Sequence, residues 1–244
     1  MTTTGNSRPL LVAHRGASTV APEHTVPAYE AAIQAGADAL ELDVHLSADD
    51  QLVVIHDARL ERTTDGRGLV RDLTLAELKR RDAGRWFGRA FRGQRIQTLS
   101  EVLERFRDRV AFGVELKGGS DFYPGIEERL LSLLQIYEVT DRTLVASFDH
   151  HALRRCRELD PEVRTGALVA GRLLAPGMLA PNGILSALCL KAELTTARDV
   201  AACRDAGLDC YVWVVNDAPA ARRFAEAGVT GIITDRPDLL RSVF

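Results

Sequence analysis

Charged side chains interrupt two apolar stretches of this chain at a spacing of two residues, as Glu41-Leu-Asp43 and Glu115-Leu-Lys117. If both stretches are strands, residues i and i+2 point to the same face. Three carboxylates brought together in a core cannot all ionise without a cation. A hard cation with oxygen ligands, Mg²⁺ or Ca²⁺, held by Glu41, Asp43 and Glu115 would remove that cost. The alternative is three unrelated carboxylates at strand ends, each paired with an Arg.

Two histidines follow predicted strands directly, as His14-Arg15 and as His56-Asp57. A His at a strand end usually has a structural role, but two beside the same carboxylates suit a general acid and a general base. Asp57 could orient His56 by accepting its other ring N–H. Arg15 and Lys117 are cations available to an anion, Arg15 as a bidentate donor to a phosphoryl group and Lys117 as a point charge.

The elements that would position these residues follow one repeated pattern. A helical stretch ends at a glycine and an apolar strand begins within a few residues, at Gly36, Gly207 and Gly228. Glycine suits the left-handed position that ends a helix. The predicted strands are Leu10–Ala13, Leu40–Val44, Leu52–Ile55, Val110–Leu116, Thr143–Ser147, Thr165–Val169, Ala187–Leu190, Tyr211–Val215 and Gly231–Thr234. The predicted helices are Pro27–Ala35, Ile126–Tyr137, His150–Leu159, Ala197–Ala206, Pro219–Ala227 and Pro237–Val243.

This alternation of about eight strands with helices predicts an α/β fold, a (β/α)₈ barrel formed by residues 1–244 as a single domain. Active sites of such barrels lie at the carboxyl ends of the strands, where the residues above are predicted to lie. A doubly wound sheet is the alternative. It is disfavoured because no G-x-G-x-x-G follows the first strand and no G-x-x-x-x-G-K occurs.

Residues 57–109 interrupt the alternation of strands and helices and are predicted to be an insertion. Between Arg59 and Arg95 there are 11 Lys or Arg and five Asp or Glu, a local charge of +6, and Trp86, Phe87 and Phe91 lie in the same stretch. One interpretation is a small satellite core with a solvated basic face. The other is a cap beside the site that attracts an anionic substrate.

The composition excludes several classes of protein. The net charge of −3, with 46% hydrophobic and 27% charged residues, is ordinary for a globular protein and disfavours a broadly basic nucleic-acid binder. No apolar run approaches the roughly 18 residues of a membrane span, and the first residues lack a secretory pattern, so we expect a cytoplasmic protein. Four cysteines without C-x-x-C spacing are predicted to be buried free thiols.

The run Asp149-His150-His151 is similar to a DHH phosphoesterase motif. It follows a predicted strand and opens a predicted helix, however, so we interpret Asp149 as a helix N-cap followed by two exposed histidines.

Taken together, these residues resemble the glycerophosphodiester phosphodiesterase family. The resemblance covers essentially the whole chain in order, and the ordered set is specific where single motifs are weak. It is carried by His14-Arg-Gly, Pro22-Glu-His-Thr25, Glu41-Leu-Asp43, His56-Asp57, Thr63-Thr-Asp-Gly66, Leu73-Thr-Leu, Glu115-Leu-Lys117, Tyr211-Val-Trp-Val-Val-Asn216 and Thr234-Asp235. The family's fold is a (β/α)₈ barrel with an insertion after the HD motif, which agrees with the interruption at 57–109.

The resemblance implies hydrolysis of glycerophosphodiesters to glycerol 3-phosphate and an alcohol, and it implies a role for each matched position. One divalent cation, Mg²⁺ or Ca²⁺, would be bound by Glu41, Asp43 and Glu115. The acid and the base would be His14 and His56, and the phosphate would be held by Arg15 and Lys117.

Four further positions carry weaker expectations. The family's P-E-N-T motif has His24 in place of Asn here, which keeps a hydrogen-bond donor and indicates a local variation. Trp213 lies on an apolar strand, where a place in the core is the alternative, but the resemblance implies that it forms a wall of the substrate pocket. His45 is expected to lie at the edge of the site, and Asp235 is expected to cap the last helix.

Three functions remain open on the sequence. The first is a soluble glycerophosphodiesterase. The second is the same barrel acting on lysophospholipids at a membrane surface, with weak surface contact through exposed aromatics of the insertion. The third is a non-catalytic barrel that binds phosphodiesters, which predicts the loss of a ligand or histidine that this chain retains. The alcohol, the metal ion and the oligomeric state are not determined by the sequence.

Overall fold

Eight parallel strands form a closed barrel in the computed structural model, which describes residues 8–179 and 183–244. The sheet order runs β1-β10-β9-β8-β7-β6-β5-β2, and pairing of β1 with β2 closes the ring. The barrel strands are β1 (Leu10–Ala13), β2 (Ala39–Leu46), β5 (Ala111–Leu116), β6 (Thr143–Ser147), β7 (Arg164–Val169), β8 (Ala187–Lys191), β9 (Asp209–Trp213) and β10 (Gly231–Thr234). The predicted (β/α)₈ barrel is therefore confirmed.

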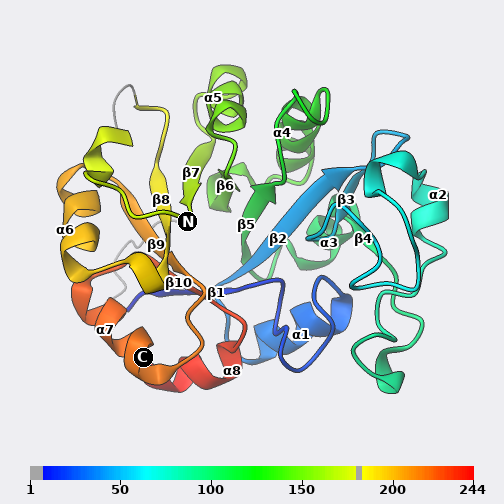
Figure 1. Cartoon of the computed structure of the whole chain (residues 1–244), viewed down its shortest axis with the longest axis horizontal. Helices are drawn as coiled ribbons and strands as arrows, with labels where there is room; N and C mark the ends of the chain where they lie inside the picture. The colour runs from blue at the N-terminus through cyan, green and yellow to red at the C-terminus, as the bar shows by residue number, and fades with distance from the viewer. Residues whose placement is uncertain (1–7, 180–182) are drawn as a thin grey trace.

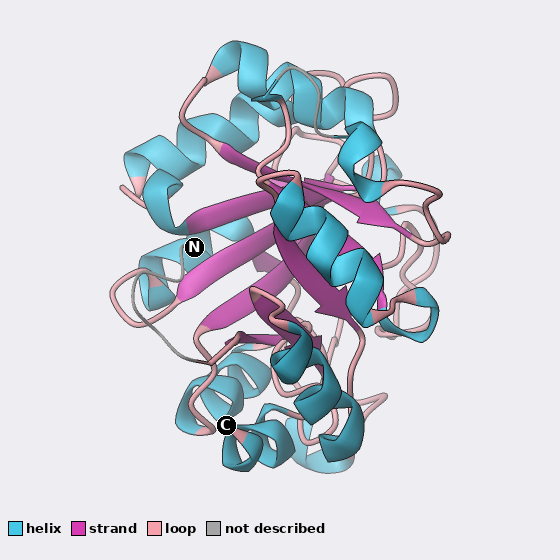
Figure 2. Ribbon diagram, turned by 90° about the vertical axis from the view of Figure 1, so that its left-hand side faces the viewer, coloured by secondary structure: helices cyan, strands magenta, loops and turns pink. Residues whose placement is uncertain are grey.

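Helices surround the barrel and cover its outer face (Figures 1 and 2). They are α1 (Val26–Gln34), α3 (Leu99–Phe106), α4 (Ile126–Ile136), α5 (His150–Leu159), α6 (Ala197–Asp205), α7 (Ala218–Ala227) and α8 (Pro237–Leu240). Helix α2 (Leu75–Leu78) lies in the segment after β3 (Leu52–Val54), at the edge of the molecule (Figure 1). Short 3₁₀ turns are η1 (Val70–Asp72), η2 (Arg89–Phe91), η3 (Thr140–Arg142), η4 (Pro176–Leu179), η6 (Ala192–Leu194) and η7 (Arg241–Val243). Among the described residues, no helix is long and apolar enough to cross a membrane.

Local sequence signals fix where many of these elements begin and end. Gly36, Gly207 and Gly228 adopt φ values of +83°, +73° and +85°, the left-handed conformation predicted for them after α1, α6 and α7. Thr98 caps α3 through a capping box with Glu101. Hydrophobic periodicity and these end signals therefore predicted the ends of most helices to within one or two residues of the observed ends.

Two separate sets of apolar side chains pack on the outer and inner sides of the barrel strands. The larger core lies between strands and helices and includes Leu40, Leu42, Phe112 and Phe224. A second cluster fills the barrel interior, where Val12, Ala39, Leu144, Ala146, Leu168, Ala187, Cys189, Tyr211 and Ile233 face one another. Because successive residues of a strand alternate between these two sides, the residues two positions beyond the interior cluster lie at the barrel mouth.

One predicted strand is not part of the barrel. The run Leu52–Ile55 forms β3 (Leu52–Val54), which pairs antiparallel with β2 and with β4 (Gln97–Thr98). The prediction of a parallel barrel strand was wrong because the connection from β2 is a tight turn, in which the Ser47 amide donates to the Gln51 carbonyl at 3.0 Å. A parallel crossover needs about a dozen residues or more.

The segment after β3 has a hydrophobic cluster of its own. Val53, Ile55, Leu60, Val70, Leu78, Ala83 and Ile96 pack together beside the barrel, as the satellite-core interpretation predicts. Helix α3, which follows β4, packs instead into the main core. In Figure 1 this segment, coloured from blue to cyan, lies at the edge of the molecule next to β2 and β3.

Candidate active site

Three carboxylates meet at the mouth of the barrel. Glu41 and Asp43 lie on β2, and Glu115 lies on β5 directly opposite Asp43 in the register of the two parallel strands. One oxygen from each carboxylate lies within 4.8 Å of the others, and all three residues are buried. Two ligands on opposite sides of one Mg²⁺ or Ca²⁺ lie about 4 to 5 Å apart. The predicted three residues are therefore brought together at a separation that fits a single divalent cation.

Burial and mutual repulsion disfavour the ionised form of two of the three carboxylates, Glu41 and Glu115. Burial and the neighbouring charges of Asp43 and Glu115 raise the pKa of Glu41 well above its usual range. Burial and the charge of Asp43 likewise raise the pKa of Glu115 to about 7. Burial opposes ionisation of Asp43 too, but its hydrogen bond from His24 and the charges of Lys117 and Arg15 hold its pKa well below the usual value. A bound divalent cation would favour the ionised form of all three.

Arg15 and Lys117 both contact the cluster. The Arg15 amide donates to Glu41 Oε2 at 3.0 Å, and its Nε lies 3.3 Å from Asp43 Oδ2. Lys117 Nζ lies 2.7 Å from Glu115 Oε1 and 3.2 Å from Asp43 Oδ1. Arg15 has a positive φ of 59°, an uncommon conformation for a residue with a side chain, which turns its amide toward Glu41. The two predicted cations thus lie within the carboxylate site.

His14 directly follows β1, and its partner is Asp235, which follows β10. His14 Nδ1 lies 2.7 Å from Asp235 Oδ1. Since a carboxylate accepts, Nδ1–H donates and Nε2 remains for another group. Ser18 Oγ and Asn216 Nδ2 also donate to Asp235, at 3.0 Å and 2.7 Å. Burial would raise the pKa of Asp235, but these donors and His14 lower it to about 2.

The expected role of Asp235 as a helix cap was wrong. Helix α8 has Arg236 at its N-cap position and no side-chain cap. Asp235 instead orients His14, across 221 residues of sequence. The sequence signal that was available is the pair Thr234-Asp235 at the end of the last strand, which carried part of the family resemblance but was interpreted only through the proline that follows.

His56 forms a second pair of the same kind. Its Nδ1 donates to Asp57 Oδ1 at 2.6 Å, which confirms the predicted orienting contact. Strand β3 runs antiparallel to β2, so the chain after Val54 returns toward Asp43, and the Ile55 amide donates to the Asp43 carbonyl at 3.0 Å. Burial, together with the charges of Lys117 and Arg15, lowers the pKa of His56 below its usual value.

A chain of ion pairs connects the insertion to the His56–Asp57 pair and to Arg15. Arg62 donates to both oxygens of Asp57, at 2.7 Å and 3.0 Å, and to both oxygens of Glu23, at 2.8 Å each. Glu23 in turn accepts from Arg15 Nη1 at 3.1 Å. Burial opposes ionisation of Glu23, but Arg62 above all lowers its pKa to about 2. Sequence reasoning missed Arg62, whose signal is its place just before the Thr63-Thr64 motif.

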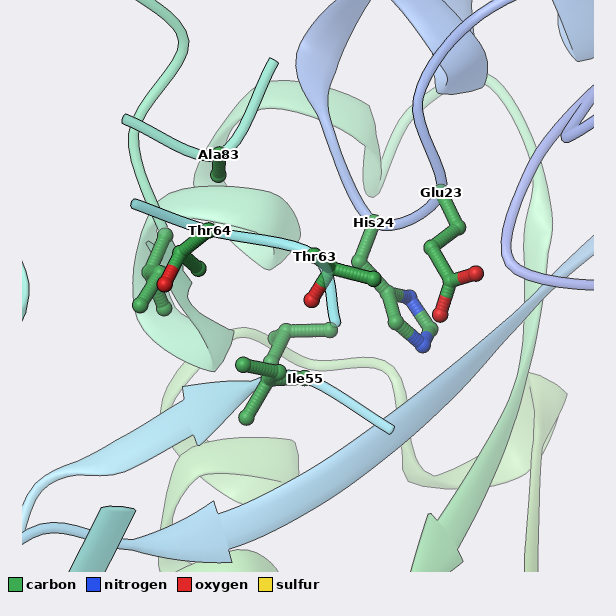
Figure 3. Close-up of a pocket in the computed structure, with 8 residues that line it drawn as sticks. Glu23, His24, Ile55, Thr63, Thr64 and Ala83 are labelled. Carbon is green, nitrogen blue, oxygen red and sulfur yellow. The ribbon is translucent and has the colours of Figure 1, made fainter. Parts of the chain in front are cut away.

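His24 lies against the cluster and is more than a local variation. Its Nε2 donates to Asp43 Oδ2 at 2.8 Å, and its Nδ1 accepts from the Tyr29 hydroxyl at 3.1 Å. Burial lowers the pKa of His24. Figure 3 shows Glu23 and His24 beside a small cavity whose other side is formed by Ile55 and by the insertion residues Thr63, Thr64 and Ala83. The insertion therefore packs against the turn that carries His24.

His45 is buried below the site, where it fixes the backbone of His56. Its Nε2 donates to the His56 carbonyl at 3.1 Å, and its Nδ1 accepts from the Tyr123 hydroxyl at 2.7 Å. Burial lowers the pKa of His45 to about 4, so it is neutral near pH 7. Its place at the edge of the site is as expected, and its hydrogen bond adds a positioning role.

Trp213, predicted as a pocket wall, is the last residue of β9. Strands β10 and β1 separate β9 from β2, which carries two of the carboxylates. Trp213 Nε1 donates to the Cys189 carbonyl at 2.8 Å, and the Trp213 ring meets the ring of Phe148 edge-on at 5.8 Å. Phe148 is 48% exposed. The pair forms an apolar edge to the barrel mouth.

The Asp149-His150-His151 run is structural, as interpreted. Asp149 Oδ1 accepts from the His151 amide at 3.0 Å and caps α5. His151 is exposed, whereas His150 is half-buried, and its Nε2 donates to the Leu168 carbonyl at 3.2 Å. The expectation of two exposed histidines was thus wrong for His150. The four cysteines are free and buried.

Comparison with known proteins gives one consistent result. The model of the glycerophosphoryl diester phosphodiesterase family matches residues 14–239. A glycerophosphodiester phosphodiesterase of Caldanaerobacter subterraneus subsp. tengcongensis is 40% identical over 95% of this chain and 96% of its own. Two solved structures align as well. A phosphodiesterase of Oleispira antarctica, in complex with the product sn-glycerol-3-phosphate, superposes with a TM-score of 0.91 at 30% identity, covering 97% of this chain and 96% of that one.

The second structure is a glycerophosphodiester phosphodiesterase of Agrobacterium tumefaciens, with a TM-score of 0.85 at 32% identity, covering 96% of this chain and 99% of that one. The match by the family model spans every site residue described above, from His14 to Asp235. The identity to the Caldanaerobacter protein extends over nearly the whole of both chains. The chain belongs to the glycerophosphoryl diester phosphodiesterase family.

Proposed function

We propose that this chain hydrolyses glycerophosphodiesters to glycerol 3-phosphate and an alcohol, with two histidines as acid and base beside one divalent cation. The chain is an enzyme of the phosphodiesterase type to which its relatives belong. The observation that carries the proposal is the pair of His–Asp contacts, His14 with Asp235 and His56 with Asp57, at the same mouth as the three carboxylates. The Oleispira antarctica relative, which holds glycerol 3-phosphate, supports the same product here.

Glu41, Asp43 and Glu115 are the proposed ligands of the cation. Their oxygens are of the kind that Mg²⁺ and Ca²⁺ prefer. Burial and the neighbouring carboxylates raise the pKa of Glu41 and of Glu115, and a bound cation would offset that effect. When bound, the cation would polarise a phosphoryl oxygen and make the glycerol 2-hydroxyl more acidic. Activity after readdition of each metal to the chelated enzyme distinguishes Mg²⁺ from Ca²⁺.

Arg15 and Lys117 are the proposed phosphate ligands. Both cations lie within the carboxylate cluster, where burial and the adjacent carboxylates keep them fixed. Charge grows on the phosphoryl oxygens as the bond to the alcohol breaks, and donors that are already oriented stabilise that charge without reorganising. Trp213 would form the apolar wall of the pocket.

His56 is the proposed base. Its pKa is lowered by burial and by nearby cations, so it is neutral near pH 7, and Nε2 can take a proton because Nδ1 donates to Asp57. His14 is the proposed acid, since Asp235 offers a fixed counter-charge to its protonated ring. The proton from the attacking oxygen goes to His56. If that oxygen is the glycerol 2-hydroxyl, a cyclic 1,2-phosphate forms as the alcohol leaves, and water then opens it to glycerol 3-phosphate. If it is water, glycerol 3-phosphate forms directly. His14 gives its proton to the leaving alcohol oxygen, and each transfer contributes about 10²–10⁴-fold.

The test is turnover of glycerophosphocholine and glycerophosphoethanolamine by the wild type, His14→Ala and His56→Ala after chelation and readdition of each metal. We expect each variant to lose at least about 10²-fold in kcat while calorimetry still shows metal binding. His151→Ala is the matched control, because His151 is exposed on α5. Wild-type activity in either variant, or in the fully chelated enzyme, would contradict the proposal.

A second candidate is hydrolysis of lysophospholipids at a membrane surface. It is favoured by exposed aromatic surface, since Trp86 is 40% exposed and Phe148 is 48% exposed. Phe87 and Phe91 do not add to it, because they are half-buried and stack edge-on with each other at 5.4 Å. Co-sedimentation with anionic liposomes that is lost in Trp86→Ala would support this candidate, and no binding at low salt would exclude it.

A cytoplasmic location is part of the proposal. Four buried free thiols suit a reducing compartment. Fractionation of cells that express the tagged full chain tests it.

A further inference from the structure

Lys191 is the last residue of β8, and the register of the sheet turns its side chain into the barrel mouth. In the pairing of β8 with β9, Lys191 is opposite Trp213 and Cys189 is opposite Tyr211. Cys189 and Tyr211 line a cavity in the barrel interior together with Glu41 and Glu115. Since residues two apart on a strand share a face, Lys191 points to the same side as Cys189, one layer nearer to the mouth. Its carbonyl accepts from Thr195 Oγ1 at 2.8 Å, which fixes the backbone there.

Strand β8 lies across the barrel from the carboxylates. Three strands separate β8 from β2 in either direction around the closed sheet, namely β9, β10 and β1 on one side and β7, β6 and β5 on the other. Figure 1 shows β8 and β2 on opposite sides of the ring. Lys191 therefore faces Glu41 and Asp43 over the space in which a substrate must lie.

The charge of Lys191 is not neutralised by a neighbour. The other cations of the site have carboxylate partners, as Arg15 has Glu23 and Lys117 has Glu115. In residues 8–179 and 183–244, no carboxylate lies within ion-pair distance of Lys191 Nζ, and no hydrogen bond involves it. Lys191 is half-buried at the end of β8, and an ammonium group without a partner there is available to an anion.

The proposed acid fixes the side of the mouth to which the alcohol departs. His14 follows β1, which pairs with β10, and β10 pairs with β9 next to β8. His56 lies at the end of β3, on the far side of β2 from these strands. An alcohol that takes its proton from His14 thus leaves the phosphorus toward β10, β9 and β8, where Lys191 is.

We propose that Lys191 selects glycerophosphodiesters whose leaving alcohol carries negative charge and discriminates against alcohols with a cationic group. The proposal rests on the proposed function and names its substrate class. Trp213 and Phe148 alone would favour a quaternary ammonium through cation–π attraction. The adjacent Lys191 ammonium repels such a group and attracts a phosphate or carboxylate, so the charge of the leaving alcohol decides between substrates.

The experiment measures kcat/KM for three diesters that differ in the alcohol. The alcohol is cationic in glycerophosphocholine, neutral in glycerophosphoglycerol and anionic in glycerophosphoinositol 4-phosphate. We expect the wild type to prefer the anionic substrate over the cationic one by about tenfold or more. Lys191→Gln should remove most of this ratio, Lys191→Glu should reverse it, and Lys191→Arg should keep it. The change should fall mainly on KM, because Lys191 contacts a part of the substrate that does not react.

Lys79→Gln is the matched control, because Lys79 pairs with Glu101 at the surface of the insertion. In Lys79→Gln, the ratio of kcat/KM for the anionic diester to that for the cationic diester should equal the wild-type ratio. A ratio that Lys191→Glu leaves unchanged would overturn the proposal. If the wild type hydrolyses none of the three diesters, the proposed function fails separately. Calorimetric binding of the same diesters to the wild type and to Lys191→Glu then decides the inference, and equal affinities for the anionic and cationic diesters would overturn it.

Discussion

The two halves of the barrel mouth are built in different ways. Around β2, nearly every polar group is paired, because β1, β3 and β5 all pair with this strand and bring their terminal residues to its carboxylates. Around β8 and β9 the mouth carries the edge-on pair of Trp213 and Phe148 and the half-buried Lys191, which has no ion-pair partner in the described part of the chain. The first half is a fixed network, and the second is an open surface.

This difference indicates that the two halves have different functions. A network of coupled charges tolerates little change, because removing one partner leaves a buried charge without compensation. A surface that carries unpaired charge and an aromatic edge can change at small cost to the fold. Loss of a charged group from the first half should therefore lower kcat or metal affinity, by orders of magnitude where that group is a proposed metal ligand or orients a histidine. Substitutions in the second half should act on the choice of substrate.

The largest effect should follow loss of a carboxylate. Glu41→Gln should lower kcat by about 10³-fold or more, since one proposed metal ligand is lost. The same change should leave the melting temperature in EDTA equal or higher. Burial and the charges of Asp43 and Glu115 disfavour the ionised form of Glu41 and raise its pKa, and a neutral amide at this position is not repelled by those carboxylates. Activity assays and differential scanning calorimetry measure the two effects. A lower melting temperature without metal would show that the repulsion is not released.

Loss of an orienting carboxylate should come next. Asp235→Asn should lower kcat by about 10²–10⁴-fold, because the amide no longer fixes the His14 ring or balances its charge. Asp57→Asn should have a similar effect through His56. Calorimetric titration with metal is the control, since neither residue belongs to the proposed ligands. Near-normal turnover in Asp235→Asn would remove His14 from the mechanism.

Asp235 also links stability to pH. Its pKa in the folded protein is about 2, below the value of about 3.9 expected in the unfolded chain. The carboxylate therefore stabilises the fold above pH 4, and this contribution, about 2 kcal/mol, is lost as the pH falls toward 2. Urea unfolding of the wild type and of Asp235→Asn at pH 7 and at lower pH measures it. The difference in the free energy of unfolding between the two proteins should shrink as the pH falls. A difference that stays constant with pH would contradict the linkage.

The contrast between Asp235 and Asp57 also shows what the sequence can and cannot predict. Asp57 is adjacent to His56, so its orienting role could be inferred from neighbouring residues and is confirmed. Asp235 is 221 residues from His14, and only the closing of the barrel through β1 and β10 brings them together. Its local signal, an acid before Arg-Pro, favoured a helix cap. Tertiary pairing overrode that local preference.

Strand β3 makes the same point for the fold. Its apolar run has the composition of a barrel strand, and periodicity carries no information on strand direction. The short turn from Ser47 to Gln51 decides the direction, because it permits only antiparallel pairing. The barrel itself was predictable, since strong alternation and the glycine end signals agree over the whole chain. The carboxylate cluster was predictable because a charge within an apolar strand is costly unless a cation or an ion-pair partner compensates it.

A smaller effect should come from the connection between the insertion and the network. Arg62→Gln should lower kcat by about tenfold, because Arg62 holds both Asp57 and Glu23 but is 43% exposed, and exposed ion pairs contribute little. Arg59→Gln is the matched control, since Arg59 pairs only with Glu61 on the surface. Steady-state kinetics with both variants measures the effect. Equal activity in the two would mean that the insertion does not support His56.

The smallest effect should follow a change of the residue that departs from the family motif. His24→Asn should weaken metal affinity by only a few-fold, because an amide can still donate to Asp43 Oδ2 while its contact with the Tyr29 hydroxyl is lost. His24→Ala should weaken it by about 10–100-fold, since the buried Asp43 then loses the hydrogen bond that His24 donates to its Oδ2. Metal titration by calorimetry measures both. If the two variants bound metal equally well, the hydrogen bond to Asp43 would have no part in holding the ligand, and the paired half of the mouth would be less tightly coupled than its contacts indicate.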